Sequence, residues 1–408
     1  MESMDQGIQH PELFGEIMEH LAPRQSEADL QALLQDNPRS FFDAICLNAL
    51  AEKAADIFWK AGAPPAFRIS SRIVQLDIEP LTAKEMEDIF FHNVMNDDQR
   101  ERFLKKPDLD TAMEIPGVVR FRVNIYKQRG GMASVMRLIP MEIPTLEELS
   151  MPKVLNQLIT YKQGMCLVTG PTGSGKSTTL AALIDLMNTN RRCNIISIED
   201  PIEFVHRDKL SIISQREIGM DTNCFADALR AVLRQAPDVI LIGEMRDVET
   251  MSIAMTAAET GHMVFSTVHT NSAAETIERI VNMYPPHEKT QICLRLSTTL
   301  LAVLSQKLVQ TIDGKARACA VEVMINTPTI SKLIEEGRSG QVLQAINEGA
   351  YWGMQSMNSS LLNHFKDGKI TEQTAVMNAG NQTEMRQSIR KIAQSKLTIT
   401  SSVRDVRS

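Results

Sequence analysis

One run of residues has the types and the spacing of a phosphate-binding loop. In Gly170-Pro-Thr-Gly-Ser-Gly-Lys-Ser177, two glycines five positions apart are followed by a lysine and a hydroxyl residue. Glycine lets the backbone come so close to phosphate oxygens that its N–H groups point at them. A helix that starts here adds the partial positive charge of its N-terminus. The run therefore predicts a nucleoside triphosphate site.

The surroundings of this run support the same interpretation. A chance match arises in on the order of one chain in a hundred, but here a predicted strand precedes it and an apolar helical pattern follows it. Lys176 is expected to reach the β- and γ-phosphates, and the Ser177 hydroxyl to coordinate Mg²⁺. The residues predicted to contact the nucleotide in this run are Gly170, Pro171, Thr172, Gly173, Ser174, Gly175, Lys176, Ser177 and Thr178.

Polar residues follow three further predicted strands, at 195–198, 239–242 and 263–268. In an open parallel sheet, ligands bind beyond the carboxyl ends of the strands. For any one such residue a solvated loop position is the commoner explanation. Their occurrence after successive strands favours one shared site around the phosphates. The residues concerned are Glu199, Glu203, Glu244 and His269.

These side chains have different expected tasks. Glu244 would orient and deprotonate the water that attacks the γ-phosphate, and its alternative is a charge at a helix N-terminus. Glu199 and Glu203 would hold Mg²⁺ directly or through water. His269 would sense the γ-phosphate or steady the network. His262 is a further candidate for a nucleotide contact, although a lone histidine beside a strand is more often structural.

The elements that must position these residues suggest an α/β protein with two domains. Alternating strands and helices over residues 143–395 predict a parallel sheet, and the chain beyond about 287 is predicted to be mostly helical. Residues 41–142 read as a smaller mixed domain. Residues 1–40 are expected to form an N-terminal extension. The tail at 396–408, rich in Ser, Thr and Arg, is expected to be disordered.

Arginines lie in a predicted hairpin of the smaller domain. Val118–Tyr126 and Ser134–Ile139 alternate as strands around a glycine turn. Arg122 and Arg137 fall on these neighbouring strands. From the residues alone, a solvated charged face is the favoured interpretation. In the larger domain, the local pattern also predicts a helix N-cap at Asn223 and another at Asp247.

Composition excludes several classes of protein. Of the 408 residues, 43% are hydrophobic and 23% charged, as in an ordinary globular protein. The net charge of −7 and the 5% of aromatic residues argue against nucleic-acid binding. The six cysteines contain no Cys-x-x-Cys pair, so a structural zinc site is not expected. The polar start and the lack of a long apolar run predict a cytoplasmic protein that meets membranes only through partners.

With these motifs in view, the sequence resembles the PilT/PilU family of type IV pilus retraction ATPases, which are secretion-type hexameric ATPases. The resemblance runs from about Ala54 to Ile392. It implies a RecA-like P-loop motor domain preceded by a PAS-like α+β domain, assembled as a homo-hexamer. The segments that carry it are Gly170–Ser177 as Walker A, Ile198–Phe204 as the Asp box, Ala236–Asp247 as Walker B, and Ala258–His262 with Thr267–Thr270 as the His box.

The resemblance also implies a function and a set of partners. ATP hydrolysis with Mg²⁺ would drive pilus retraction, and hence twitching motility, at the inner face of the cytoplasmic membrane. An inner-membrane pilus platform protein would be a partner. In the family, arginines of the N-terminal domain approach the phosphates, and Arg122 and Arg137 match those positions.

Within the family, the amino-acid sequences of several segments are closer to those of PilU, the accessory motor. Autonomous motors carry Ala-Ile-Arg-Asn-Leu-Ile-Arg-Glu near the C-terminus, whereas this chain has Thr329–Glu336, with Ser331 and Glu335 in place of two arginines. The resemblance therefore predicts dependence on a PilT-like partner ATPase. A related secretion or conjugation ATPase, a ring-forming ATP-binding adaptor and a nucleic-acid translocase are the alternatives.

Overall fold

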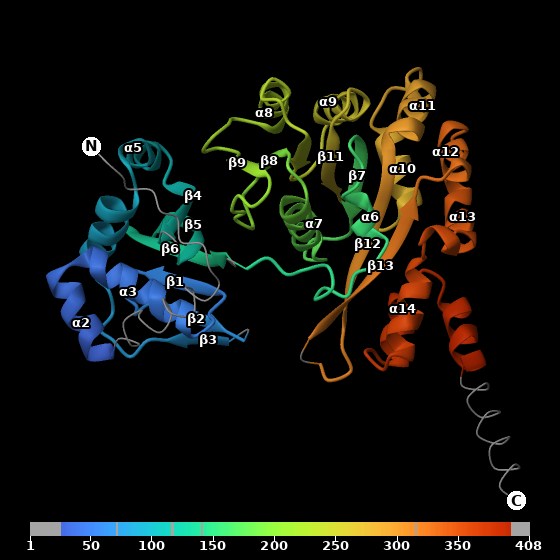
Figure 1. The fold of residues 1–408 in the computed structure, drawn as a ribbon. Coiled ribbons are helices and arrows are strands. Elements are labelled where there is room, and N and C mark those ends of the chain that lie inside the picture. Colours follow the sequence, from blue (N-terminus) through green and yellow to red (C-terminus); the bar gives the residue numbers. More distant parts are fainter. Residues whose placement is uncertain (1–25, 71, 116–117, 140–141, 315, 393–408) are drawn as a thin grey trace, which may run out of the picture. The chain divides into compact units, whose positions relative to one another are not determined.

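The chain folds into two compact units, Met1–Met141 and Glu142–Ser408, in the computed structural model (Figure 1). The tail predicted at 396–408 lies outside the described residues, as does most of the predicted extension. The structure describes residues 26–392 except 71, 116–117, 140–141 and 315.

The described part of the first unit contains one six-stranded antiparallel sheet, with the strand order β3-β2-β1-β6-β5-β4. Its strands are β1 (Asp56–Lys60), β2 (Ala66–Ile69), β3 (Arg72–Gln75), β4 (Asp108–Ile115), β5 (Val119–Gln128) and β6 (Gly131–Ile139). Its helices are α2 (Glu27–Asp36), α3 (Pro38–Ala51), α4 (Ala83–Glu87), the π-helix η1 (Asp88–Val94) and α5 (Asp97–Lys105). The predicted arginine hairpin is confirmed as β5 and β6, whereas β4 was not predicted.

One face of this sheet forms the core of the unit. Alternate residues of β5 are buried, beginning with Val119 and Phe121, because successive side chains of a strand point to opposite faces. Trp59 of β1 stacks on Phe42 of α3 at 5.5 Å between ring centroids. Leu30 of α2, inside the range expected to be an extension, is buried in the same core. Arg122, between buried neighbours in β5, is exposed.

The second unit contains a seven-stranded sheet in its described residues, with the order β13-β12-β7-β11-β10-β8-β9. All neighbouring strands are parallel except β12 and β13. The strands are β7 (Gly164–Thr169), β8 (Asn194–Glu199), β9 (Ile212–Glu217), β10 (Val239–Ile242), β11 (Met263–Val268), β12 (Leu300–Gln310) and β13 (Arg317–Ile325).

Helices cover both faces of this sheet, so β7, β10 and β11 are buried along their entire length. Cys166 and Val168 pack with α7 on one face, and Met165 and Leu167 pack with α8 and α9 on the other. The helices are α6 (Leu155–Leu158), α7 (Lys176–Asn190), α8 (Phe225–Val232), α9 (Val248–Glu259), α10 (Ala273–Asn282), α11 (Lys289–Thr299), α12 (Pro328–Glu335), α13 (Val342–Glu348), α14 (Met357–Lys366) and α15 (Glu372–Asn378), with short 3₁₀ turns η2 (Ser339–Gln341) and η3 (Ala350–Trp352).

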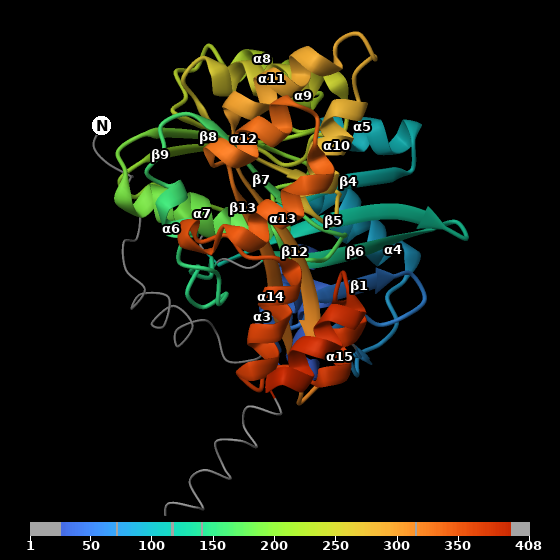
Figure 2. The same cartoon turned by 90° about the vertical axis from the view of Figure 1, so that its right-hand side faces the viewer.

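The local expectations for this unit are met in part. The described chain beyond 287 is mostly helical, as predicted, but it also contains β12 and β13, which form a long antiparallel pair against which α14 lies (Figure 2). The apolar run that starts β12 becomes a strand because it pairs with β7, more than a hundred residues earlier. Helix α8 is capped at Cys224 without a side-chain hydrogen bond, not at Asn223. The predicted cap at Asp247 is confirmed, since its carboxylate accepts from Thr250 N–H at 2.8 Å.

No helix among the described residues has both the length and the apolar character that crossing a bilayer requires.

Candidate active site

The predicted phosphate-binding loop leaves the carboxyl end of β7 and leads directly into α7. Gly170 has φ +146°, and a Cβ atom there would lie 2.4 Å from the Gln306 carbonyl oxygen and 2.5 Å from Ser174 Oγ. Gly175, with φ +88°, forms the N-cap of α7. Both positions therefore require glycine, one for space and backbone conformation and the other for conformation. The N–H groups of the first turn of α7 have no acceptor within the helix and lie beside the loop. They can therefore donate hydrogen bonds to a phosphate bound there.

Lys176 lies under this loop. Its Nζ donates to the carbonyl oxygens of Gly170 and Pro171, both at 3.0 Å, and the residue is only 8% exposed. Burial lowers the pKa of Lys176, while the charges of Glu203 and Glu244 act in the opposite direction. The ammonium group is thus near two carboxylates that the sequence assigned to the same site.

Glu244 and His269 meet at the carboxyl ends of the neighbouring parallel strands β10 and β11. The Glu244 carboxylate lies 2.8 Å from Arg246 Nε through one oxygen and 3.5 Å from His269 Nε2 through the other. Its side chain is 15% exposed. A carboxylate oriented from both sides and close to Lys176 is well placed to position a water molecule beside a bound phosphate.

The Glu199 carboxylate is held in place by hydrogen bonds within the protein, so it is less free to move than a carboxylate that only binds a metal ion. Its Oε1 accepts from Ser197 Oγ at 2.7 Å and from Gln215 Nε2 at 3.0 Å. The backbone of Glu203 also donates to its carboxylate, and burial raises the Glu199 pKa. Glu199 therefore orders the segment that follows β8 and presents Glu203, whose side chain is exposed.

The donor set suits a magnesium ion that arrives with a nucleotide. Mg²⁺ keeps several waters and takes one or two protein oxygens together with phosphate oxygens. Ser177 in the first turn of α7 and the exposed carboxylate of Glu203 supply oxygen ligands of this kind. Within residues 26–392, wherever they are described, no three His, Cys, Asp or Glu side chains form a metal cage. A dedicated protein-only metal site is thus not what these residues build.

His262 does not join this group. It precedes β11, and its carbonyl accepts from Gly164 N–H at 3.1 Å at the start of β7. Its Nδ1 lies 3.0 Å from the Ala257 carbonyl. The length of β11, roughly 20 Å at about 3.3 Å per residue, separates it from His269. The structure therefore places His262 at the opposite edge of the sheet from the phosphate loop, and its interpretation as a nucleotide contact is not retained.

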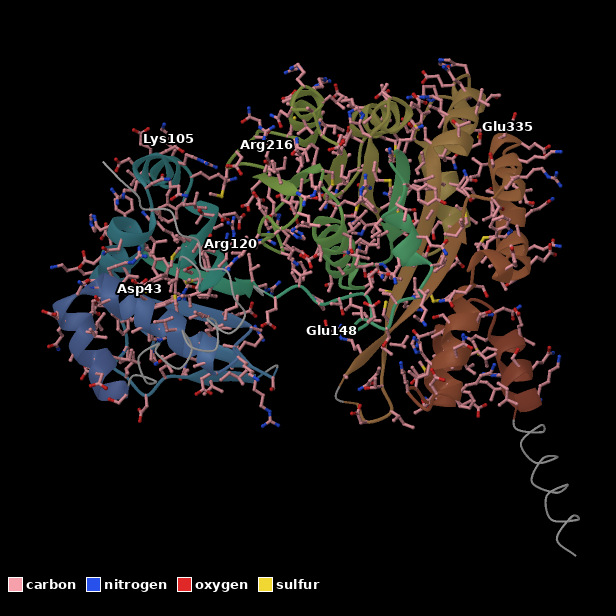
Figure 3. The ribbon with its side chains drawn as sticks, viewed as in Figure 1. Asp43, Lys105, Arg120, Glu148, Arg216 and Glu335 are labelled. Atoms are coloured by element: carbon pink, nitrogen blue, oxygen red, sulfur yellow. The ribbon has the colours of Figure 1, made fainter. Side chains whose placement is uncertain are left out.

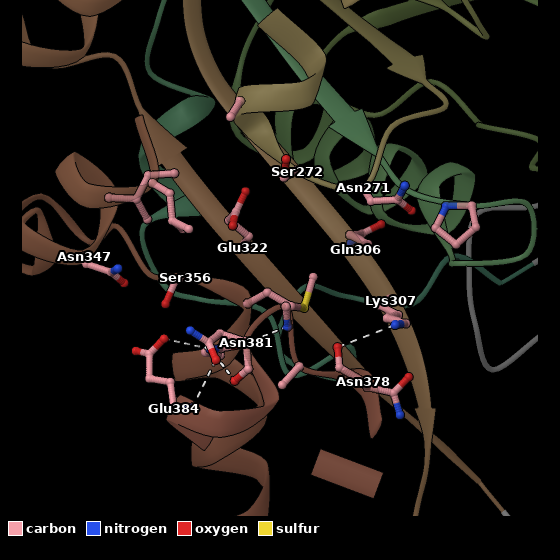
Figure 4. Close-up of a pocket in the computed structure, with 18 residues that line it drawn as sticks. Asn271, Ser272, Gln306, Lys307, Glu322, Asn347, Ser356, Asn378, Asn381 and Glu384 are labelled. Atoms are coloured by element: carbon pink, nitrogen blue, oxygen red, sulfur yellow. Dashed lines mark hydrogen bonds between the residues drawn. The ribbon is translucent and has the colours of Figure 1, made fainter. Parts of the chain in front are cut away.

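Gln306 is a site residue that sequence reasoning missed. Besides its carbonyl against Gly170, its Nε2 donates to Thr179 Oγ1 of α7 at 2.7 Å. It also lines a cavity of about 470 Å³ together with Pro171 and Glu322, between the sheet and the C-terminal helices (Figure 4). No local signal marks Gln306, because β12 reaches the loop only through its pairing with β7.

Arg122 and Arg137 belong to the first unit, where they lie directly opposite each other on β5 and β6. Arg137 Nε contacts Asp56 Oδ1 at 2.9 Å. Arg120, two residues before Arg122 and labelled in Figure 3, is instead 3.7 Å from Glu114. The predicted neighbourhood of the two arginines is confirmed within this unit.

The chain is similar to known proteins over most of its length. The model of the type II/IV secretion system protein family matches residues 36–406. The type IV pilus retraction ATPase PilT of Pseudomonas aeruginosa is 45% identical over 322 residues, which are 79% of this chain and 93% of that protein. The type IV pilus ATPase PilU of the same organism is 39% identical over 341 residues, or 83% of this chain and 89% of that protein.

A solved structure agrees with these sequence matches. The crystal structure of the pilus retraction motor PilT with bound ADP superposes with a TM-score of 0.79 at 41% identity. The match covers 84% of this chain and 98% of that structure. The RecA-like motor domain and the separate N-terminal domain expected from the sequence are therefore confirmed.

The buried position of Lys176 leads to a first prediction. Lys176→Ala is expected to lower ATP turnover by at least about a hundred- to a thousandfold, the usual effect of deleting one preorganised donor to a developing charge. The measurement is phosphate release by the purified full-length protein. Lys209→Ala, which removes a surface lysine paired with Asp185, is the matched control and should retain activity. Equal turnover in both variants would contradict the assigned task.

A second prediction concerns Glu244. Glu244→Gln keeps the shape but removes the base, so turnover should fall about a hundred- to ten-thousandfold while ATP still binds. Nucleotide binding by fluorescence anisotropy and turnover by phosphate release check the two halves. The control is Glu249→Gln, an exposed carboxylate in the first turn of α9 that pairs with Arg230. If binding disappears together with turnover, Glu244 is a structural or metal-holding residue.

Proposed function

The chain belongs to the family of type II/IV secretion system proteins, it is an ATPase, and on that premise we propose that its ATP hydrolysis powers retraction of a type IV pilus. The observation that carries this proposal is the grouping of Lys176, Glu244 and His269 beyond the carboxyl ends of parallel strands. The similarity to PilT over 93% of its length supports the pilus as the moved object.

In the proposed reaction, each residue acts on the phosphates or on the attacking water. The loop N–H groups and Lys176 hold the β- and γ-phosphates, and Glu244 accepts the proton of the water. Arg246 and His269 fix the Glu244 carboxylate from opposite sides. Bound Mg²⁺, held by Ser177 and Glu203, would neutralise negative charge on the phosphates.

We further propose that the active ring has six subunits and that Arg122 and Arg137 supply positive charge to a phosphate bound by another subunit. Both side chains are exposed, and 68% of the Arg137 side chain is accessible. Arginine fingers of this kind contribute about a thousand- to a hundred-thousandfold in other phosphoryl-transfer enzymes. A cation that reaches the phosphate only when domains move would couple rotation to hydrolysis.

Mixed rings test this sharing of the site. A Glu244→Gln subunit and an Arg122→Ala, Arg137→Ala subunit should each be nearly inactive alone. Mixed rings should regain part of the turnover, because some interfaces then combine two intact halves. Co-purification through two different affinity tags identifies the mixed rings, and phosphate release measures their activity.

Two results of the mixing experiment would overturn the sharing. One is the absence of any recovery in rings that carry both tags. The other is full activity of the double-arginine variant by itself, which would make both arginines surface charge only.

An accessory role beside a second, PilT-like motor is also proposed, with both acting at the inner face of the membrane through a platform protein. The support is Ser331 and Glu335 on α12, where autonomous motors carry arginines. Ser331 Oγ donates to the Ser297 carbonyl at 2.9 Å, and Glu335 is exposed (Figure 3). Overall identity, 45% to PilT and 39% to PilU, does not favour the accessory assignment, so it rests on α12 and on the local sequence segments that resemble PilU.

Cell motility tests the retraction role and the accessory role together. Deleting the gene in the source organism should leave pili on the surface and reduce twitching. Expressing this chain as the sole retraction ATPase should fail to restore movement, whereas adding the second motor should restore it. The Lys176→Ala variant, which lacks turnover, controls for a scaffolding effect.

The outcomes separate the two roles. Normal twitching and normal pilus number after deletion would reject retraction as the function. Robust twitching with this chain alone would keep retraction and reject the accessory role.

A further inference from the structure

Four charged residues form one row across the sheet of the first unit. Arg68 of β2 lies opposite Asp56 of β1, Asp56 lies opposite Arg137 of β6, and Arg137 lies opposite Arg122 of β5. Residues directly opposite each other in an antiparallel sheet point to the same face. The row therefore lies on the face of the sheet opposite to the one that carries Ile57 and the core residues packed around it.

Asp56 is the one buried member of this row. It is 4% exposed, and its two carboxylate oxygens are divided between two arginines. Arg68 Nε lies 2.7 Å from Oδ2, and Arg137 Nε lies 2.9 Å from Oδ1. A buried carboxylate is tolerated only when it is paired and hydrogen-bonded, so the pairing fixes both guanidinium groups to the sheet.

The hydrogen bond from Arg137 to Asp56 uses Nε, and the terminal amino groups of Arg137 donate no hydrogen bond to any residue in the described part of the chain. An arginine presents donors on more than one edge, and the pair of terminal amino groups fits a phosphate in a bidentate way. The side chain is 68% exposed despite the anchor. Asp56 thus holds the near edge of the guanidinium and leaves the far edge available. A lysine would have to make both contacts through one nitrogen, without the separate donor edges of a guanidinium.

We propose that Asp56 is a positioning residue that holds Arg137 in the orientation needed to reach a phosphate. This inference rests on the proposed catalytic role of Arg137. A long arginine side chain has many rotamers, and ordering it in the transition state costs conformational entropy. An arginine already fixed at Nε needs less ordering, so its far edge can stabilise developing charge without first being immobilised.

The competing explanation is that Asp56 only forms a structural ion-pair network. A variant at Arg68 distinguishes this explanation from the positioning role. Arg68 shares Asp56 but has no proposed catalytic task. Its guanidinium also lies over the Phe58 ring, 4.9 Å from the centroid, so its own packing resembles that of a structural residue. If Asp56 only stabilises the sheet, loss of Arg68 and loss of the Asp56 charge should have similar effects on turnover.

The test uses full-length rings and separates kcat from KM. Asp56→Asn keeps the size of the side chain and removes its charge. We expect kcat to fall about 10- to 100-fold, the scale of a misplaced catalytic group, with KM for ATP little changed. Arg68→Gln is the matched control and should keep kcat near the unaltered protein. Equal losses of kcat in Asp56→Asn and Arg68→Gln would overturn the positioning role.

A double-mutant cycle provides the decisive comparison. If Asp56 acts only through Arg137, Asp56→Asn should cause no further loss when Arg137→Ala is already present. Single-turnover assays with labelled ATP measure the small residual rates. The same fractional loss in both backgrounds would reject the proposal. Full turnover of the Arg137→Ala variant would instead reject the catalytic role of Arg137. If Asp56→Asn has normal turnover while Arg137→Ala is inactive, only the positioning role is rejected.

Assembly is checked first, by size-exclusion chromatography and thermal unfolding. If Asp56→Asn fails to assemble, Asp56→Glu replaces it, because a longer carboxylate keeps the charge and moves the anchor. Reduced kcat in assembled Asp56→Glu rings with unchanged KM is the expected result. An Asp56→Glu ring with unaltered kcat would contradict the requirement for a fixed Arg137.

Discussion

The tight contact between the phosphate loop and the neighbouring strand is the constraint on which the active site depends. Gly170 lies so close to the Gln306 carbonyl of β12 that no side chain fits at its position. This contact, with the bond from Gln306 to Thr179, ties the loop and α7 to the sheet at two points. A rigid loop can point its N–H groups at phosphates before they arrive, which is what preorganised electrostatic stabilisation requires.

The charged groups of the motor unit are arranged around that rigid loop. The Lys176 ammonium is buried and bonded to loop carbonyls, so its position is fixed by the same backbone that binds phosphate. Glu244 is held between Arg246 and His269, which come from loops after adjacent strands. Parallel strands bring these groups together because all their carboxyl ends lie at one edge of the sheet. Perturbed ionisable groups cluster at functional sites, and Lys176, whose pKa is lowered by burial, lies among the carboxylates of this group.

The first unit uses a different solution to present charge. Its sheet buries one face and exposes the other, so alternate positions of the same strands pack in the core and present charged side chains outward. Val123 and Phe121 fill the core, while Arg122 between them faces outward. Asp56 then converts part of that outward face from mobile side chains into a fixed array by pairing with Arg68 and Arg137. If these arginines approach a phosphate as proposed, ordering them in advance lowers the entropy cost of that contact.

Short stretches of the sequence were sufficient to predict the features that depend on local chemistry. The glycine spacing with Lys176 and Ser177 predicted the phosphate loop, and the polar residues after apolar strands predicted the meeting of Glu244 and His269. Both follow from short stretches of chain with a strict physical requirement. Tertiary structure decided the rest. The strand character of β12, the role of Gln306, the remote position of His262 and the pairing of Asp56 with two arginines all depend on partners distant in sequence, and such partners leave no mark in a local pattern of residues.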